Sequence, residues 1–428
     1  MTLVADGMGG ENGRKLMVRE ICRSSCATAI SCGPPPEGLA PRPLTWQDTG
    51  MQAGTTIFEH MSGLARAHDA INLGQGFPDF GWPAEVLAAG ATAITTGYNQ
   101  YPPMRGLPEL RRAVADFYRR RQGLAVTPEQ VIVTSGATEA LAASIMAVAG
   151  TGDEVILFAP AYDAYAPLVR RAGAQPVWVD LQPPDWQASA EAIAAAITPA
   201  TRALVINTPH NPTGGIASPA MLAAIASLAR AHDLTIISDE VWEEVIIGAA
   251  PHISPFSLAP ERTIKIGSAG KLLALTGWKV GWVVAEPALA ERVAQVHQFL
   301  TFTTPPPLQV AVATGLDLPD AWYDAGRARF VVARDRLAAA LTTGGWVLLP
   351  TAGSYFLMAD LAASGIGLGD HDFCEAAVAQ AGVAAIPLCA FMPNAAQTRF
   401  IRLCFAKSDA VLDAGAERLN AARRQFGT

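Results

Sequence analysis

Residues 267–282 read GSAGKLLALTGWKVGW and place Lys271 among small side chains, with a second lysine, Lys279, eight positions later. Most lysines are exposed because the ammonium group is strongly hydrated. Small neighbours that remove water from Lys271, together with a nearby cation, favour the neutral amine, which is the nucleophilic form. The segment therefore predicts a reactive lysine rather than two surface lysines.

The same segment does not match the common glycine-containing nucleotide motifs. A phosphate-binding P-loop needs a glycine five residues before its final glycine and a hydroxyl residue after its lysine. This chain has Lys265 and Leu272 at those positions. No Gly-x-Gly-x-x-Gly sequence follows an expected strand, which argues against a dinucleotide-binding fold. A site built around a reactive lysine is the interpretation that remains.

Two further segments offer polar groups that such a lysine could use. Residues 205–214, VINTPHNPTG, pass from an apolar run into a polar, proline-rich turn, and residues 235–240, TIISDE, carry an apolar run to the carboxylate of Asp239. In open α/β sheets, ligands bind beyond the carboxyl ends of the strands. We therefore expect both segments and the lysine segment to meet at that edge of a sheet.

Short apolar segments alternate with alanine-rich helical segments along most of the chain. The expected strands are residues 131–134, 154–158, 176–181, 203–207, 234–238, 263–267 and 280–285. Strands joined by helical crossovers form parallel sheets with helices on their faces. The pattern predicts an α/β fold with a largely parallel sheet.

The chain from about residue 54 to residue 419 resembles the fold type I pyridoxal-phosphate-dependent aminotransferases of class I, in particular the methionine and kynurenine/glutamine aminotransferase branch. The blocks that carry this resemblance occur in the expected order: residues 71–80, 99–101, 207–214, 238–241, 267–282 and 401–405. The resemblance implies a large cofactor-binding domain, residues 76–314, with a mainly parallel seven-stranded sheet. It also implies a small α+β domain made of residues 51–75 and 315–428. Residues 1–50, rich in glycine and proline, are expected to be a disordered extension.

The resemblance assigns two catalytic residues. Lys271 is expected to bind pyridoxal phosphate as a Schiff base and then to move a proton between the substrate α-carbon and the cofactor. Asp239 is expected to pair with the pyridine nitrogen and keep it protonated. The implied cofactor-binding residues are Gly136, Ala137, Thr138, Tyr162, Asn211, Asp239, Ser268, Lys271, Lys279 and, from the neighbouring subunit, Tyr101.

The resemblance also implies how substrate is held. Arg402 matches the arginine that grips the α-carboxylate in a bidentate pair. The implied substrate-binding residues are Arg402, Asn211, Gly76, Phe58 and, across a dimer, Phe302. Because Tyr101 and Phe302 are expected to serve the neighbouring active site, the resemblance implies a homodimer with shared sites.

This chain departs from the family pattern at two positions. Trp242 stands three residues after Asp239, where the family commonly has a tyrosine that hydrogen-bonds the 3′ oxygen of the cofactor. Thr303 stands where kynurenine/glutamine enzymes tend to have histidine. The second departure favours the bacterial methionine aminotransferases, and an apolar pocket would suit methionine or aromatic side chains.

Three functional classes therefore compete. The first is an aminotransferase moving the amino group of methionine, and of aromatic amino acids or glutamine, to a 2-oxo acid. The second comprises a kynurenine/glutamine aminotransferase or a carbon–sulfur β-lyase on the same fold. The third is a non-catalytic, pyridoxal-phosphate-binding regulator, which would need a DNA-binding segment that the first fifty residues do not resemble.

Composition excludes several other partners. A net charge of −7 over 428 residues argues against nucleic acid, and no apolar run reaches the roughly 18 residues that span a bilayer. The six cysteines form no Cys-x-x-Cys pair with matching histidines, so we expect no metal and a reduced, cytoplasmic protein. A metal or redox cluster of Cys22, Cys26 and Cys32 is the open alternative.

Overall fold

A seven-stranded sheet lies at the centre of the residues that the computed structural model describes, which are 56–97, 99–248, 251–393 and 398–427. Its strands, in spatial order, are β2 (Val131–Thr134), β8 (Gly281–Val284), β7 (Thr263–Ser268), β6 (Thr235–Asp239), β5 (Thr201–Asn207), β3 (Glu154–Ala159) and β4 (Gln175–Asp180). β8 is antiparallel to both neighbours, and the other pairs are parallel. The predicted α/β fold with a mainly parallel seven-stranded sheet is confirmed. The predicted extension, residues 1–50, and Cys22, Cys26 and Cys32 lie outside the described residues.

The predicted strand boundaries lie within two residues of the observed ones. β2 has the predicted bounds, whereas β5 begins at Thr201, two residues early, and β6 ends at Asp239, one residue late. The differences arise because backbone pairing sets the ends of a strand. Asp239, for example, is polar but still pairs with Asn207 on one side and Ile266 on the other.

The sheet is buried on both faces, which explains its nearly continuous apolar strands. Successive side chains of a strand point to opposite faces. In β2, Val131 and Val133 join one apolar cluster and Ile132 joins the other. Trp282 and Val283 of β8 divide in the same way.

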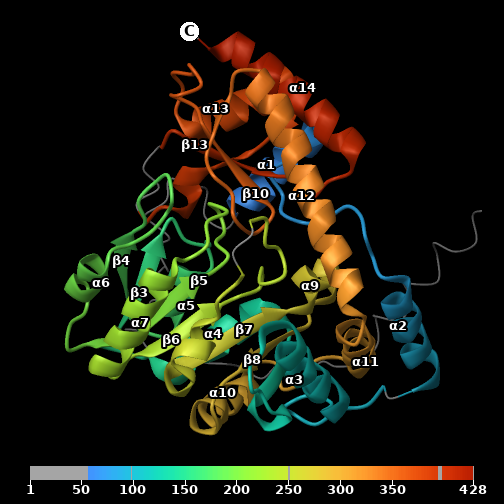
Figure 1. The fold of residues 1–428 in the computed structure, drawn as a ribbon, viewed down its shortest axis with the longest axis vertical. Coiled ribbons are helices and arrows are strands. Elements are labelled where there is room, and N and C mark those ends of the chain that lie inside the picture. Colours follow the sequence, from blue (N-terminus) through green and yellow to red (C-terminus); the bar gives the residue numbers. More distant parts are fainter. Residues whose placement is uncertain (1–55, 98, 249–250, 394–397, 428) are drawn as a thin grey trace, which may run out of the picture. The chain divides into compact units, whose positions relative to one another are not determined.

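Helices cover this sheet and connect its strands (Figure 1). The helices of this part of the chain are α2 (Ala84–Thr96), which packs against α11, and α3 (Pro108–Gln122), α4 (Gly136–Val148), α5 (Tyr165–Arg171), α6 (Ala190–Ala195), α7 (Pro219–Ala231), α8 (Pro255–Leu258), α9 (Ala269–Leu272), α10 (Pro287–Leu300) and α11 (Pro306–Leu316). α4 packs against β6, β7, β8 and α10. None of the helices in the described ranges is both long enough and apolar enough to cross a membrane.

A second, four-stranded sheet is antiparallel throughout. Its order is β12 (Ile386–Pro387), β13 (Phe400–Cys404), β10 (Phe356–Asp360) and β9 (Val347–Leu348). The helices α1 (Ile57–Ala67), α12 (Asp320–Thr343), α13 (Asp370–Ala376) and α14 (Asp409–Phe426) belong to the same part of the chain. The long helix α12 runs beside α14 (Figure 1).

Residues close to the start of the described chain join this C-terminal part. β1 (Ile71–Asn72) pairs in parallel with β11 (Val383–Ala384), and α1 packs against β11 and β12. The pairing holds the segment after β1, residues 74–80, close to β13. It also supports the division into residues 76–314 and residues 51–75 with 315–428, which we keep as a proposal.

Candidate active site

A cavity of about 150 Å³ lies at the carboxyl ends of β5, β6 and β7. The predicted residues that line it are Gly136, Ala137, Thr138, Tyr162, Asn211, Asp239, Ser268, Lys271 and Lys279. The cavity is also lined by Tyr165, Asn207 and Trp242. The structure therefore brings together nine of the ten predicted cofactor-binding residues, which come from segments far apart in the sequence.

Lys271 follows β7 directly, on the short helix α9. Burial lowers the pKa of its amine to about 8, although the charge of Asp239 opposes that change. The positive charges of Lys279 and Arg402 lower the pKa further. The amine nitrogen lies 4.7 Å from the centroid of the Trp242 ring. An amine with this pKa can both accept and donate a proton near neutral pH.

Asp239 ends β6, and its side chain is held in place by two donors. The hydroxyl of Tyr165 donates to Oδ2 at 2.7 Å, and the Val241 amide donates to Oδ1 at 3.3 Å. Burial raises the pKa of Asp239 to about 6, while the Tyr165 and Val241 hydrogen bonds and the Lys271 charge oppose that rise. Burial also raises the pKa of the Tyr165 phenol well above its usual value, so this group stays a donor.

Asn207 connects Asp239 with Asn211, a link that sequence reasoning missed. Its Nδ2 donates to the main-chain oxygen of Asp239 at 2.8 Å, and its Oδ1 accepts from the Asn211 amide at 2.7 Å. Two strand ends are therefore locked together by a single amide side chain. The available signal was an asparagine at the point where the apolar run 203–206 turns polar, directly before the Thr208-Pro209 turn.

The start of α4 forms a concave surface of backbone amides next to Lys279. Gly136 has φ +76°, a left-handed conformation that favours glycine. A Cβ on Gly281 would lie 2.7 Å from the carbonyl carbon of Gly136 and 2.8 Å from the Ala137 nitrogen, so only glycine permits this close approach. A Cβ on Gly136 would lie 3.3 Å from the Lys279 ammonium nitrogen.

A helix N-terminus with free amides, a hydroxyl from Ser268 and one ammonium group is the donor set that binds a phosphate dianion. Asp239 at the other end of the cavity is a suitable partner for a protonated ring nitrogen. The residues present therefore fit pyridoxal phosphate, which has both groups.

Arg402 lies on β13 and is 1% exposed. It donates to the Oδ1 of Asn211 and to the main-chain oxygen of Gly74, both at 2.7 Å. Its Nε is buried and has no hydrogen-bond partner among the described residues. Burial lowers the pKa of Arg402 to about 10, so the group remains cationic at neutral pH. A buried cation with an unused donor is suited to an anionic ligand such as a carboxylate.

Three aromatic rings surround this guanidinium group. Its central carbon lies 3.9 Å from the ring centroid of Phe356, 5.1 Å from that of Phe58 and 5.2 Å from that of Phe391. Phe58 was predicted, whereas Phe356 and Phe391 were not, because they follow no motif in the sequence. Gly76 lies against the same wall, since a Cβ there would lie 2.7 Å from the Phe356 ring.

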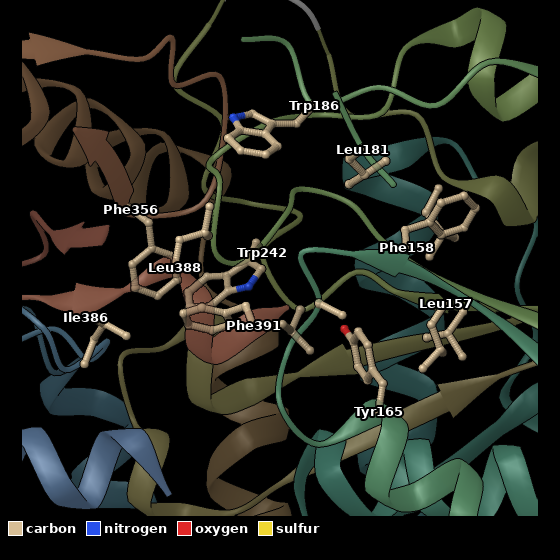
Figure 2. Packing of buried hydrophobic residues seen from close by; sticks show 14 of the residues in the cluster. Leu157, Phe158, Tyr165, Leu181, Trp186, Trp242, Phe356, Ile386, Leu388 and Phe391 are labelled. Carbon is tan, nitrogen blue, oxygen red and sulfur yellow. The ribbon is translucent and has the colours of Figure 1, made fainter. Parts of the chain in front are cut away.

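Trp242, the departure from the family pattern, is 3% exposed and lines the cavity. Its ring meets Tyr355 and Phe356 edge to face, with centroids 4.2 and 5.5 Å away. Figure 2 shows it with Phe356, Leu388 and Phe391. The indole is therefore buried within an aromatic cluster at the edge of the cavity.

Tyr101 and Phe302 are not part of the cavity in this chain. Tyr101 is 81% exposed and Phe302 is 40% exposed, and their rings meet edge to face with centroids 5.7 Å apart. Their role in the active site of a neighbouring subunit stays a prediction.

Comparison with known proteins identifies the class. The model of the family "Aminotransferase class I and II" matches residues 68–419. The chain therefore belongs to this family, and it is a pyridoxal-phosphate-dependent aminotransferase.

Individual relatives differ in their substrates. The solved structure of N-succinyldiaminopimelate aminotransferase from Mycobacterium tuberculosis is 43% identical, covers 86% of this chain and 97% of that chain, and has a TM-score of 0.83. Methionine aminotransferase of Escherichia coli is 40% identical over 380 residues, covering 88% of this chain and 98% of that protein. Human kynurenine–oxoglutarate transaminase 1 is 35% identical, covering 83% and 93%. The family and these enzymes exclude the predicted alternative of a non-catalytic regulator.

Proposed function

We propose that this aminotransferase moves the amino group of methionine, and also of aromatic amino acids and glutamine, to a 2-oxo acid. The observation that carries the proposal is the Arg402 guanidinium, with its unused buried Nε, inside a wall of three aromatic rings. The cation suits the α-carboxylate shared by all amino acids. The rings suit an apolar side chain, because each buried methylene contributes about 0.8 kcal/mol.

In this proposal, Lys271 is the residue that moves protons. Bound pyridoxal phosphate supplies an electron-withdrawing ring that stabilises negative charge at the substrate α-carbon. The ε-amine of Lys271, with its pKa near 8, would take a proton from that carbon and donate it to the cofactor in one half-reaction, and it would move a proton in the opposite direction in the other half-reaction. Trp242 lies against this amine and limits the access of water to it.

The other residues hold the reactants in position. The Asp239 carboxylate keeps a proton on the ring nitrogen, and Tyr165 and Asn207 hold Asp239 in place. The Oδ1 of Asn211 accepts from Arg402, which leaves its side-chain amide nitrogen free to donate to the 3′ oxygen of the cofactor. Gly136, Ala137, Thr138, Ser268 and Lys279 would hold the phosphate, and Tyr162 would lie against the ring.

We further propose a cytoplasmic homodimer with shared active sites. Large apolar side chains are exposed on α2 and the segment after it, near the end of α10, and on α11: Leu87, Ile94, Tyr101, Phe299, Leu300, Phe302 and Val310. A partner subunit would cover them. In sedimentation velocity, Phe299→Asp should shift a dimer toward monomer, since Phe299 is 85% exposed and its replacement does not disturb the core.

One observation favours a second substrate class, a longer amino acid with a distal carboxylate such as N-succinyldiaminopimelate. A further cavity of about 250 Å³ is lined by Lys271, Phe80 and Arg329, among others. Arg329 lies over the Phe80 ring at 3.4 Å and forms no ion pair within the described ranges. It could bind the distal carboxylate, which methionine lacks.

The first experiment follows the absorption of the bound cofactor after methionine is added without any oxo acid. A shift to the amine form, reversed by a 2-oxo acid, is the expected result. A spectrum that methionine leaves unchanged but N-succinyldiaminopimelate shifts would favour the second substrate class. In that case Arg329→Ala should weaken the binding of N-succinyldiaminopimelate and leave the binding of methionine unchanged. Release of pyruvate and ammonia from cystathionine would instead indicate the β-lyase.

A further inference from the structure

Glu139 lies in the first turns of α4, directly beneath the amides proposed to bind phosphate, yet it faces away from them. Its Oε2 accepts a hydrogen bond from the Ser135 amide at 2.5 Å. Its Oε1 accepts from the Nδ1 of His297 and from the Thr301 hydroxyl, both at 2.6 Å. A buried carboxylate with three donors is fully satisfied within the protein, so it is not available to a ligand.

His297 is the buried counter-ion of Glu139. Its side chain is fully buried, its Nδ1 faces the Glu139 carboxylate, and its Nε2 faces the main-chain oxygen of Met104 at 3.0 Å. A carboxylate and a carbonyl oxygen only accept hydrogen bonds, so both ring nitrogens must carry a proton. His297 is therefore an imidazolium. Burial alone would lower its pKa, but the hydrogen bond and charge of Glu139 raise it above the usual value.

The same histidine holds the segment that carries the exposed aromatic pair. Its main-chain oxygen accepts from the amides of Thr301 and Phe302. The Met104 oxygen that its ring binds lies three residues after Tyr101. We call residues 101–104 and 301–304, which these bonds join, the Tyr101–Phe302 corner. A second link is the Ser135 hydroxyl, 3.4 Å from the hydroxyl of Thr304.

We propose that Glu139 and His297 are positioning residues that couple occupation of the cofactor phosphate site to the conformation of the Tyr101–Phe302 corner. The inference rests on the proposed phosphate role of residues 136–138. An anion that orders these amides also fixes Ser135 and the first turn of α4. The Glu139–His297 ion pair then restricts the conformation of the Tyr101–Phe302 corner, which a partner subunit would contact. The coupling is reciprocal, so a partner on the corner strengthens cofactor binding.

The test compares amide hydrogen exchange of residues 301–304 with and without pyridoxal phosphate, and it leaves out residues 101–104 because Tyr101 is itself expected to reach the cofactor of the neighbouring subunit. In the wild type, the cofactor should slow exchange at residues 301–304 by about tenfold, a typical allosteric coupling. His297→Gln should reduce that difference and weaken cofactor binding, because coupling is reciprocal and only the Glu139–Thr301 and Ser135–Thr304 contacts remain. The matched control is His60→Gln, which removes an exposed His–Glu pair, His60 with Glu375 at 2.9 Å, and should behave as wild type.

Because His297→Gln leaves Glu139 buried without its counter-ion, a second variant guards against misfolding. The double variant Glu139→Gln/His297→Gln replaces the ion pair with two neutral amides that can still hydrogen-bond. It should fold and bind cofactor, and its hydrogen exchange at residues 301–304 should respond to cofactor less than that of the wild type. Corner exchange that responds to cofactor in the double variant as in the wild type would overturn the proposal. A wild type that forms no visible cofactor band with Lys271 would instead overturn the proposed cofactor roles.

Discussion

Replacing Tyr165 by phenylalanine isolates one hydrogen bond, the 2.7 Å contact from the phenol to Oδ2 of Asp239. Burial already raises the pKa of Asp239 to about 6, and this hydrogen bond is the largest of the effects that hold it down. A hydrogen bond to a charged group contributes about 1.5–3 kcal/mol. At 1.36 kcal/mol per pKa unit, Tyr165→Phe should raise the pKa of Asp239 by about one to two units.

The sign of the effect on cofactor binding follows from this shift. Pyridoxal phosphate with a protonated ring nitrogen selects the ionised Asp239, so its affinity falls as pH drops through the pKa of that carboxyl. In the Tyr165→Phe variant, the affinity for pyridoxal phosphate should begin to fall about one to two pH units higher than in the wild type. The assay is a titration of the cofactor-free protein with pyridoxal phosphate from about pH 5 to about pH 9.

The control for this experiment is Tyr118→Phe. Tyr118 is another buried tyrosine whose hydroxyl donates to a carboxylate, Glu243, at 2.9 Å, but it does not line the cavity. It should leave the affinity profile unchanged. The phosphate of the cofactor also titrates in this range, but it does so equally in all three proteins. Identical midpoints for Tyr165→Phe and wild type would refute the role given to Tyr165.

Three other variants test separate parts of the structure. Lys271→Ala should abolish both turnover and the absorption band of the covalent bond between Lys271 and the cofactor, and retention of either one in purified protein would contradict its assignment. Trp242→Tyr restores the phenol usual in the family and should change the pH titration of the cofactor spectrum; an unchanged titration would show that the 3′ oxygen gains no new donor. Lys265→Met removes the ammonium that lies 2.5 Å from Glu240 and 2.6 Å from Glu243. Because both carboxylates are buried, urea denaturation should show that the free energy of unfolding falls by about 3–5 kcal/mol. A fall of less than about 1 kcal/mol would mean that the other hydrogen-bond donors are enough to stabilise the two carboxylates.

Much of the fold was predictable because local patterns decide it. The apolar runs and the helical segments between them predicted all seven strands of the large sheet to within two residues. The proline-rich signal placed the turn after β5. The second sheet was not predicted strand by strand. β9 and β12 have two residues each, too short to show a periodic pattern.

The predicted site residues also depended on the resemblance more than on spacing. Lys271, Asp239 and Arg402 each lie in a recognisable block. Tyr165 and Asn207 lie beside such blocks, but hydrogen-bonding side chains at strand ends are common, and nothing local shows which partner they find. Phe356 and Phe391 were missed because neither lies in a recognisable block, and only the folded chain brings their rings to Arg402.

The sequence by itself therefore determined the class of fold, the cofactor and the side chains able to do the chemistry, because these depend on short motifs in a fixed order. The tertiary structure alone decided the protonation states of these side chains. Burial lowers the pKa of Lys271 and raises that of Asp239, and the Glu139 and Met104 acceptors require His297 to be charged. The physical reason is that desolvation and hydrogen bonding depend on neighbours that only folding brings together, such as Asn211 and Arg402, 191 residues apart.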